Sequence, residues 1–122
     1  MKSALITGTS SGIGFAIAEK ILNLGYKVYG LSRTKPERLI DNPNFQFVDC
    51  DLRDAKILRR KIDEIQSSDK SIYLLVNNAG FGLIGFHEEL DYKKLEEIIQ
   101  VNLTAPILIT RLLLRQIKAN QG

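Results

Sequence analysis

The sequence predicts an α/β protein in which helices cover both faces of a parallel sheet. Strand and helix patterns alternate along the chain, and a glycine-rich turn joins the first strand to the first helix. The run Ile72–Val76 is apolar throughout, which is typical of a strand covered on both faces. Right-handed crossovers in such a sheet bring the carboxyl ends of the strands to one edge, where ligands bind.

Composition sets the class of protein. The 122 residues predict one domain, and 44% hydrophobic with 25% charged residues are ordinary values for a globular chain. The net charge is +3, and the densest basic group, in residues 53–61, shares its helix with acidic residues, so we expect a solvated face and no nucleic-acid partner. The single cysteine, Cys50, excludes an internal disulfide and fits a reducing compartment. A strand begins directly after Met1-Lys2-Ser3, and Arg111 interrupts the longest apolar stretch, so we expect a cytoplasmic protein without a membrane partner.

The first strand and helix define a β-turn-α unit. The strand covers about residues 3–7, and the helix after the turn ends near Leu24 because Gly25 suits a left-handed cap. The periodicity predicts one apolar helix face, formed by Ile13, Ile17, Ile21 and Leu24.

The later elements follow from the same signals. Alternation, apolar runs and Asn/Pro breaks predict further strands over residues 27–31, 45–48 and 72–76. Helical spacing and capping residues predict helices over residues 37–40, 53–66 and 91–119.

The glycine-rich turn is the strongest local signal. Its glycines allow a tight turn and close approach of an anion, and the first N–H groups of the following helix lack internal partners. A plain glycine-rich loop is the alternative, but the strand before it and the helix after it favour a nucleotide phosphate site. The phosphate-binding residues predicted here are Gly8, Ser10, Ser11, Gly12, Ile13 and Gly14.

Four motifs occur together and in order. They are Thr7-Gly-x-x-x-Gly-Ile-Gly14, Asp51-Leu52, Asn77-Asn-Ala-Gly80 and Val101-Asn102. This set resembles the short-chain dehydrogenase/reductase family, in its compact single-domain branch, from Ser3 to Gly122. The resemblance implies an NAD(P)-dependent oxidoreductase that acts on an alcohol or ketone as its small-molecule substrate. It also implies a Rossmann-type, doubly wound sheet with strand order 3-2-1-4, truncated before strand five.

In dinucleotide-binding folds, the residues at the end of the second strand discriminate between NAD and NADP. Ser32 and Arg33 stand there in place of an acidic residue that would bind the ribose of NAD. A guanidinium binds a 2′-phosphate well, so we expect NADP, with NAD as the weaker cofactor. The alternative is a surface arginine that pairs with Glu37.

The resemblance assigns further contacts to the next two strand ends. Asp51 and Leu52 would contact the adenine, although Asp51 could instead cap the helix that begins near Arg53. Asn78, Ala79 and Gly80 would contact the adenosine ribose, although asparagine and glycine also make ordinary turns.

Asn102 lies inside the long helix, where asparagine is a poor helix former. Pro106 removes the N–H that would bond to its carbonyl, so a local break is expected. In the family the matching asparagine holds a water in the proton relay; a solvent-facing polar residue is the alternative. His87, the only histidine, is interpreted as a surface residue, and no metal site is expected.

The family's catalytic tyrosine and lysine are missing from these residues. No Tyr-x-x-x-Lys occurs, and the serine of strand five would lie beyond Gly122. We therefore expect the 122 residues to bind cofactor and to be inactive alone. The long helix 91–119 and the edge strand 72–76 are apolar, which predicts a homo-oligomer through either or both. A non-catalytic nucleotide-binding or redox-sensing module, or an oligomerisation module without ligand, is the alternative function.

Overall fold

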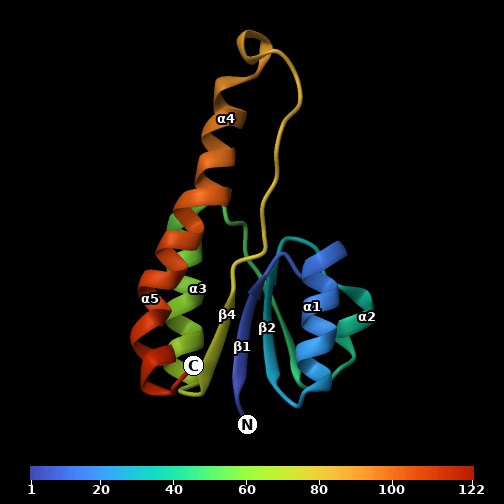
Figure 1. Cartoon of the computed structure of the whole chain (residues 1–122), viewed down its shortest axis with the longest axis vertical. Helices are drawn as coiled ribbons and strands as arrows, with labels where there is room; N and C mark the ends of the chain where they lie inside the picture. Colours follow the sequence, from blue (N-terminus) through green and yellow to red (C-terminus); the bar gives the residue numbers. More distant parts are fainter.

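A four-stranded parallel sheet forms the centre of the molecule. The structure is a computed structural model that describes residues Met1–Gly122. Strands β1 (Ser3–Thr7), β2 (Lys27–Ser32), β3 (Phe45–Asp49) and β4 (Ile72–Val76) pair in the order β3-β2-β1-β4 (Figure 1). The predicted strand order 3-2-1-4 is confirmed.

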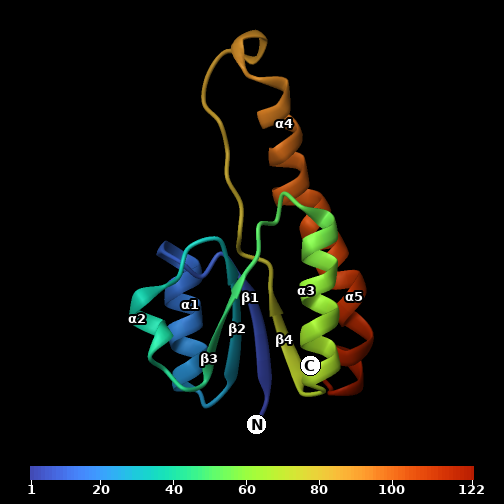
Figure 2. The same cartoon turned by 180° about the vertical axis from the view of Figure 1, so that it is seen from behind.

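Helices cover both faces of this sheet. Helices α1 (Gly12–Asn23) and α2 (Glu37–Ile40) lie on one face, and α3 (Ala55–Ser68) and α5 (Ala105–Ala119) lie on the other (Figure 2). Successive side chains of a strand point to opposite faces. Accordingly Ala4 and Ile6 belong to the apolar cluster beneath α1, and Leu5 belongs to the cluster beneath α3 and α5.

The predicted apolar face of α1 is wrong at both of its ends. Ile13 and Leu24 are 75% and 60% exposed, whereas Gly14, Ala18 and Leu22 are the buried residues of the helix. The small side chains at positions 14 and 18 let the helix backbone approach the sheet. The face of α1 that contacts the sheet is therefore centred on these small residues and not on the largest apolar side chains.

Strand β4 is less covered than its sequence predicted. Only Ile72 is buried, and the other four residues of the strand are partly exposed. The reason is topological, because β4 is an edge strand and pairs only with β1.

The chain after β4 projects beyond the carboxyl ends of the strands. Residues 81–90, with a short 3-10 turn at His87–Glu89, lead up to α4 (Tyr92–Ile99), which stands clear of the sheet (Figure 1). A π-helical segment, Gln100–Thr104, joins α4 to α5, so the expected local break in the long helix is present. By length and composition alone, the run Tyr92–Ala119 could span a membrane, and 22% of its most apolar window is buried. Core helices of soluble proteins, which are mostly buried, pass the same test.

The opposite end of the sheet is closed by Asp69. Its carboxylate accepts hydrogen bonds from the Ser3 hydroxyl at 2.7 Å, the Tyr29 hydroxyl at 2.9 Å and the Ser71 N–H at 2.7 Å. Burial alone would raise the pKa of Asp69, but these three donors outweigh it and lower the pKa below its usual value. Asp69 therefore joins β1, β2 and the start of β4 as a charged acceptor.

Candidate functional site

A cavity of about 350 Å³ lies at the carboxyl ends of the strands. It is lined by ten of the predicted site residues: Gly8, Ser10, Ser11, Ser32, Arg33, Asp51, Leu52, Asn78, Ala79 and Gly80. Leu31, Cys50, Arg53, Phe81 and Val101 also line it. The structure thus brings three strand ends and the glycine-rich turn to one cavity, as expected for a sheet of this class.

The glycine-rich turn contributes backbone to this cavity. Gly8 and Gly12 have φ values of +74° and +59°, a region that glycine adopts without strain. A Cβ on Gly14 would overlap the carbonyl oxygen of Gly8, so only glycine fits there. Gly12, Ile13 and Gly14 shape the turn and do not line the cavity themselves.

The N-terminus of α1 has no side-chain cap. Ser11 precedes it with an extended backbone and makes no capping hydrogen bond, whereas Asp54 and Asp91 cap α3 and α4. The first N–H groups of α1 are therefore available to an anion from outside the chain. A diphosphate suits this end of the helix in charge and in hydrogen-bonding capacity.

The turn after β4 is bonded directly to the glycine-rich turn. The Thr7 hydroxyl oxygen accepts hydrogen bonds from the N–H groups of Asn78 at 3.1 Å and Ala79 at 3.0 Å. The Asn78 amide donates to the carbonyl oxygens of Thr7 at 3.2 Å and Gly8 at 3.3 Å. Thr7 is a positioning residue: it was named as the first residue of the glycine-rich motif, but the sequence assigned it no role of its own.

Ser32 and Arg33 differ in what they offer a ligand. Ser32 is 8% exposed, and its hydroxyl donates to the carbonyl oxygen of Thr34 at 2.8 Å. Arg33 is exposed and forms no ion pair, so the alternative pairing with Glu37 is not formed. A free guanidinium at the rim of the cavity suits a phosphate group.

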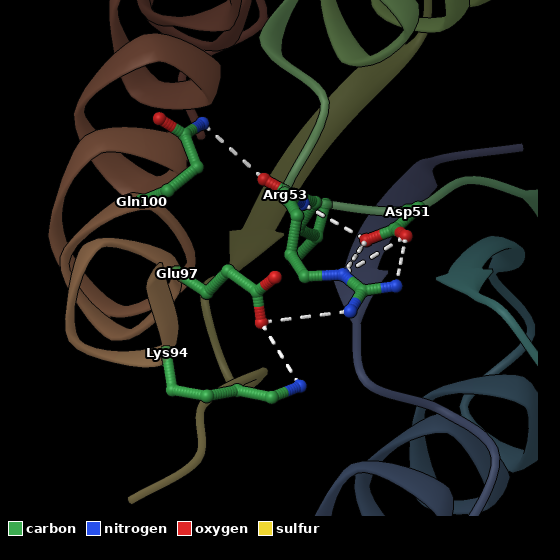
Figure 3. Close-up of polar contacts among 6 residues, drawn as sticks. Asp51, Arg53, Lys94, Glu97 and Gln100 are labelled. Carbon is green, nitrogen blue, oxygen red and sulfur yellow. Dashed lines mark hydrogen bonds and ion pairs between the residues drawn. The ribbon is translucent and has the colours of Figure 1, made fainter. Parts of the chain in front are cut away.

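Asp51 does not cap α3. Asp54 caps that helix, accepting from the N–H groups of Lys56 and Ile57 at 3.1 Å each. The Asp51 carboxylate instead accepts from the Arg53 backbone N–H at 3.0 Å and from the Arg53 guanidinium at 2.7 to 3.0 Å (Figure 3). The hydrogen bonds from Arg53 hold the pKa of Asp51 below its usual value, so the carboxylate is ionised at neutral pH.

Asn102 lies in the π-helical segment and does not line the cavity. Its side-chain oxygen accepts from the Phe81 N–H at 2.9 Å, and its side-chain amide donates to the Phe81 carbonyl at 2.7 Å. The alternative of a side chain facing only solvent is therefore wrong.

Cys50 and His87 have no surroundings that indicate a nucleophile or a metal ligand. Cys50 is 2% exposed, and burial raises the pKa of its thiol to about 11. His87 is exposed, and no group of three His, Cys, Asp or Glu residues is placed to hold a metal ion.

The fold is a parallel α/β sheet with a cavity at the carboxyl ends of its strands, the edge at which sheets of this class bind dinucleotides. A sequence profile of the family described as short chain dehydrogenase matches residues 2–122, and the chain belongs to that family. The chain is 33% identical over 116 residues to a "probable short-chain type dehydrogenase/reductase" of Helicobacter pylori, covering 94% of this chain and 43% of the relative. It is 34% identical over 119 residues to a "probable NADP-dependent dehydrogenase" of Haemophilus influenzae, and the match covers 92% of this chain and 46% of that relative.

A solved structure gives the same result. A metagenomic short-chain oxidoreductase in complex with NADP superimposes with a TM-score of 0.88 at 28% identity, covering 97% of this chain and 57% of that one. The chain spans about half the length of the curated relatives it matches. The remaining half of those relatives has no counterpart among these 122 residues.

Proposed function

We propose that this chain is the cofactor-binding part of an NADP-dependent oxidoreductase that moves a hydride between nicotinamide and an alcohol or ketone. The observation that carries the proposal is the cavity at the strand ends, where a glycine-rich turn, an ionised aspartate and a free arginine meet. A cytoplasmic protein with a small-molecule substrate belongs to the same proposal.

The residues present fit a dinucleotide. The uncapped N-terminus of α1 suits its diphosphate, and the absence of a side chain at Gly14 lets that helix end pack against the Gly8 carbonyl group. Asp51 is an acceptor for an adenine amino group, and Asn78 and Ala79 present backbone where the ribose would lie. When bound, the nicotinamide supplies the hydride donor or acceptor.

The preference for NADP rests on Arg33. A bidentate contact between a guanidinium and a phosphate contributes about 1.5–3 kcal/mol, which corresponds to roughly a tenfold or greater change in affinity. An acidic residue at this position would repel the 2′-phosphate, and Ser32 and Arg33 do not.

Calorimetric titration with NADPH and NADH tests the proposal. We expect tighter binding of NADPH, and an Arg33→Ala variant that loses about tenfold affinity for NADPH and little for NADH. Arg59→Ala, on the exposed face of α3 outside the cavity, is the matched control and should bind as the wild type does. Tighter binding of NADH, or unchanged NADPH affinity in Arg33→Ala, contradicts the assignment.

A second candidate function is a non-catalytic nucleotide-binding or redox-sensing module. This function requires only the cavity at the strand ends, whose lining residues all lie within residues 1–122. We expect the chain alone to bind NADPH without consuming it when ketones are added, followed by the absorbance of the reduced nicotinamide. Turnover by these residues alone would contradict that expectation.

We also propose that the chain self-associates. The outer face of the long helix exposes four large apolar side chains, and β4 leaves one edge unpaired. These side chains are Ile99, Leu103, Ile107 and Leu114, which are 48% to 61% exposed. Sedimentation at tens of micromolar should give a dimer or larger species, and Leu103→Glu should shift it toward monomer. A wild-type monomer at that concentration contradicts the proposal.

A further inference from the structure

Helix α4 has little support from the body of the protein. None of its residues is buried, and it stands clear of the sheet and of the other helices (Figure 1). Its side chains make polar contacts with the body at a single point: Glu97 with Arg53. One turn further on, the Gln100 amide donates to the carbonyl oxygen of Leu52 at 3.3 Å. The turn between β3 and α3 therefore anchors α4.

That same turn lines the cofactor cavity. Asp51, Leu52 and Arg53 are consecutive lining residues. Arg53 uses Nε and Nη2 on the Asp51 carboxylate, with the shortest distance 2.7 Å from Nη2 to Oδ2 (Figure 3). Its remaining nitrogen, Nη1, lies 3.6 Å from Oε2 of Glu97. One planar group thus contacts a carboxylate in the cavity and a carboxylate on α4.

We propose that Arg53 is a positioning residue that couples the purine end of the cofactor site to helix α4 through Glu97. The guanidinium is rigid, so its two carboxylate partners cannot be reoriented independently. A ligand that bonds to Asp51 fixes the plane of Arg53, and Arg53 in turn restrains Glu97. Occupancy of the purine end therefore restrains the free-standing helix.

The pair is more protected than an ordinary surface ion pair. The side chains of Arg53 and Glu97 are 34% and 16% exposed, whereas those of Arg60 and Glu64 on α3 are 66% and 59% exposed at 3.8 Å. Lys94 also approaches Glu97, at 3.4 Å, and supplies a second cation to the same oxygen. Glu64 on α3 is a matched control for Glu97, because it is also a helical glutamate paired with an arginine but does not line the cavity.

The coupling rests on the proposed function, because it requires an adenine nucleotide at Asp51. The probe is 2′,5′-ADP, which carries the adenine and the 2′-phosphate without the nicotinamide. In the full chain, amide hydrogen exchange of residues 92–99 is measured with and without a saturating concentration of this probe. Wild type, Glu97→Gln, Arg53→Lys and Glu64→Gln are compared, and calorimetry gives each dissociation constant.

In the wild type and in Glu64→Gln, we expect the probe to slow exchange of α4 by about threefold, in line with one well-placed ion pair. In Glu97→Gln and Arg53→Lys, α4 should exchange about threefold faster without ligand, and the slowing by the probe should disappear. A variant that combines Glu97→Gln and Arg53→Lys should show the same exchange rates of α4 as either single variant, because both substitutions remove the same ion pair. A merely structural contact would change the first rate and leave the response to the probe intact.

Two different results would overturn the coupling. If the wild type does not bind 2′,5′-ADP, the proposed function fails and the coupling fails with it. If the wild type binds the probe but α4 is not slowed, or if Glu97→Gln is slowed equally, the coupling alone is wrong and the nucleotide site stands.

Discussion

Replacement of Gly14 by alanine tests whether the glycine-rich turn is packed as tightly as the structure indicates. A Cβ at this position would overlap the Gly8 carbonyl group, whose carbon would lie only 2.8 Å away. Backbone cannot rotate aside, so the overlap should cost about 3 kcal/mol, the upper end of ordinary overpacking. Alanine is a better helix former by about 1 kcal/mol, which leaves a net loss of about 2 kcal/mol. For a chain of this length, that loss lowers Tm by roughly 8 °C.

The assay is thermal unfolding followed by circular dichroism, with Gly82→Ala as the matched control. Gly82 has no atom within 4 Å of a built Cβ and no positive φ, so the same chemical change should alter Tm by about 2 °C or less. Gly14→Ala should also weaken NADPH binding, because Gly8, which the new side chain would displace, lines the cavity. If Gly14→Ala melts within about 2 °C of the wild type, the turn can relax, and the argument for a rigid anion cradle is wrong.

Three other predictions concern different parts of the fold. Asp69 has a lowered pKa, so its stabilisation is present above about pH 4 and is lost as the pH falls through the lowered value. Tyr29→Phe, which removes one donor to that carboxylate, should cost about 1.5 kcal/mol at pH 7 and less below pH 4, measured by urea unfolding; a cost independent of pH would contradict this. Cys50 should resist alkylation at pH 8 until the chain is unfolded, and rapid labelling of the native protein would contradict its burial. Asn102→Ala removes both hydrogen bonds to the Phe81 backbone, so exchange of the amides in residues 81–90 should rise several-fold, and unchanged exchange would show that the loop is held elsewhere.

The strands could be predicted because each is marked locally, whereas the order 3-2-1-4 followed from the resemblance to a known family. The strands carry apolar runs bounded by turn residues, and the glycine-rich turn fixes the first β-turn-α unit. The wrong prediction concerned which face of α1 is buried, because tertiary packing determines that face. Periodicity placed Ile13 and Leu24 on the buried face of α1, but Gly14 and Ala18 set how close the helix comes to the sheet. Apolar periodicity weighs side-chain size, and close packing of a helix on a sheet selects small residues instead.

Ten of the predicted site residues meet at one cavity because they lie at strand ends or in the glycine-rich turn, and the carboxyl ends of parallel strands share one edge. Gly12, Ile13, Gly14 and Asn102 do not line that cavity. The competing interpretation of Asp51 as a helix cap was undecidable from sequence, because Asp51 and Asp54 are both acceptable caps for the helix that follows. The hydrogen bonds of Asp54 to Lys56 and Ile57 decide it. Asp51 instead bonds to Arg53 and lines the cavity.

Arg53 shows why the remaining contacts could not be predicted. In the sequence it belongs to a basic cluster on a helix with nearby acids, and the natural interpretation is a solvated face. Its contact with Glu97 joins residues 44 positions apart and depends on where α4 leaves the π-helical segment. A contact between residues so far apart in the sequence depends on how the helices pack, and no local pattern encodes it.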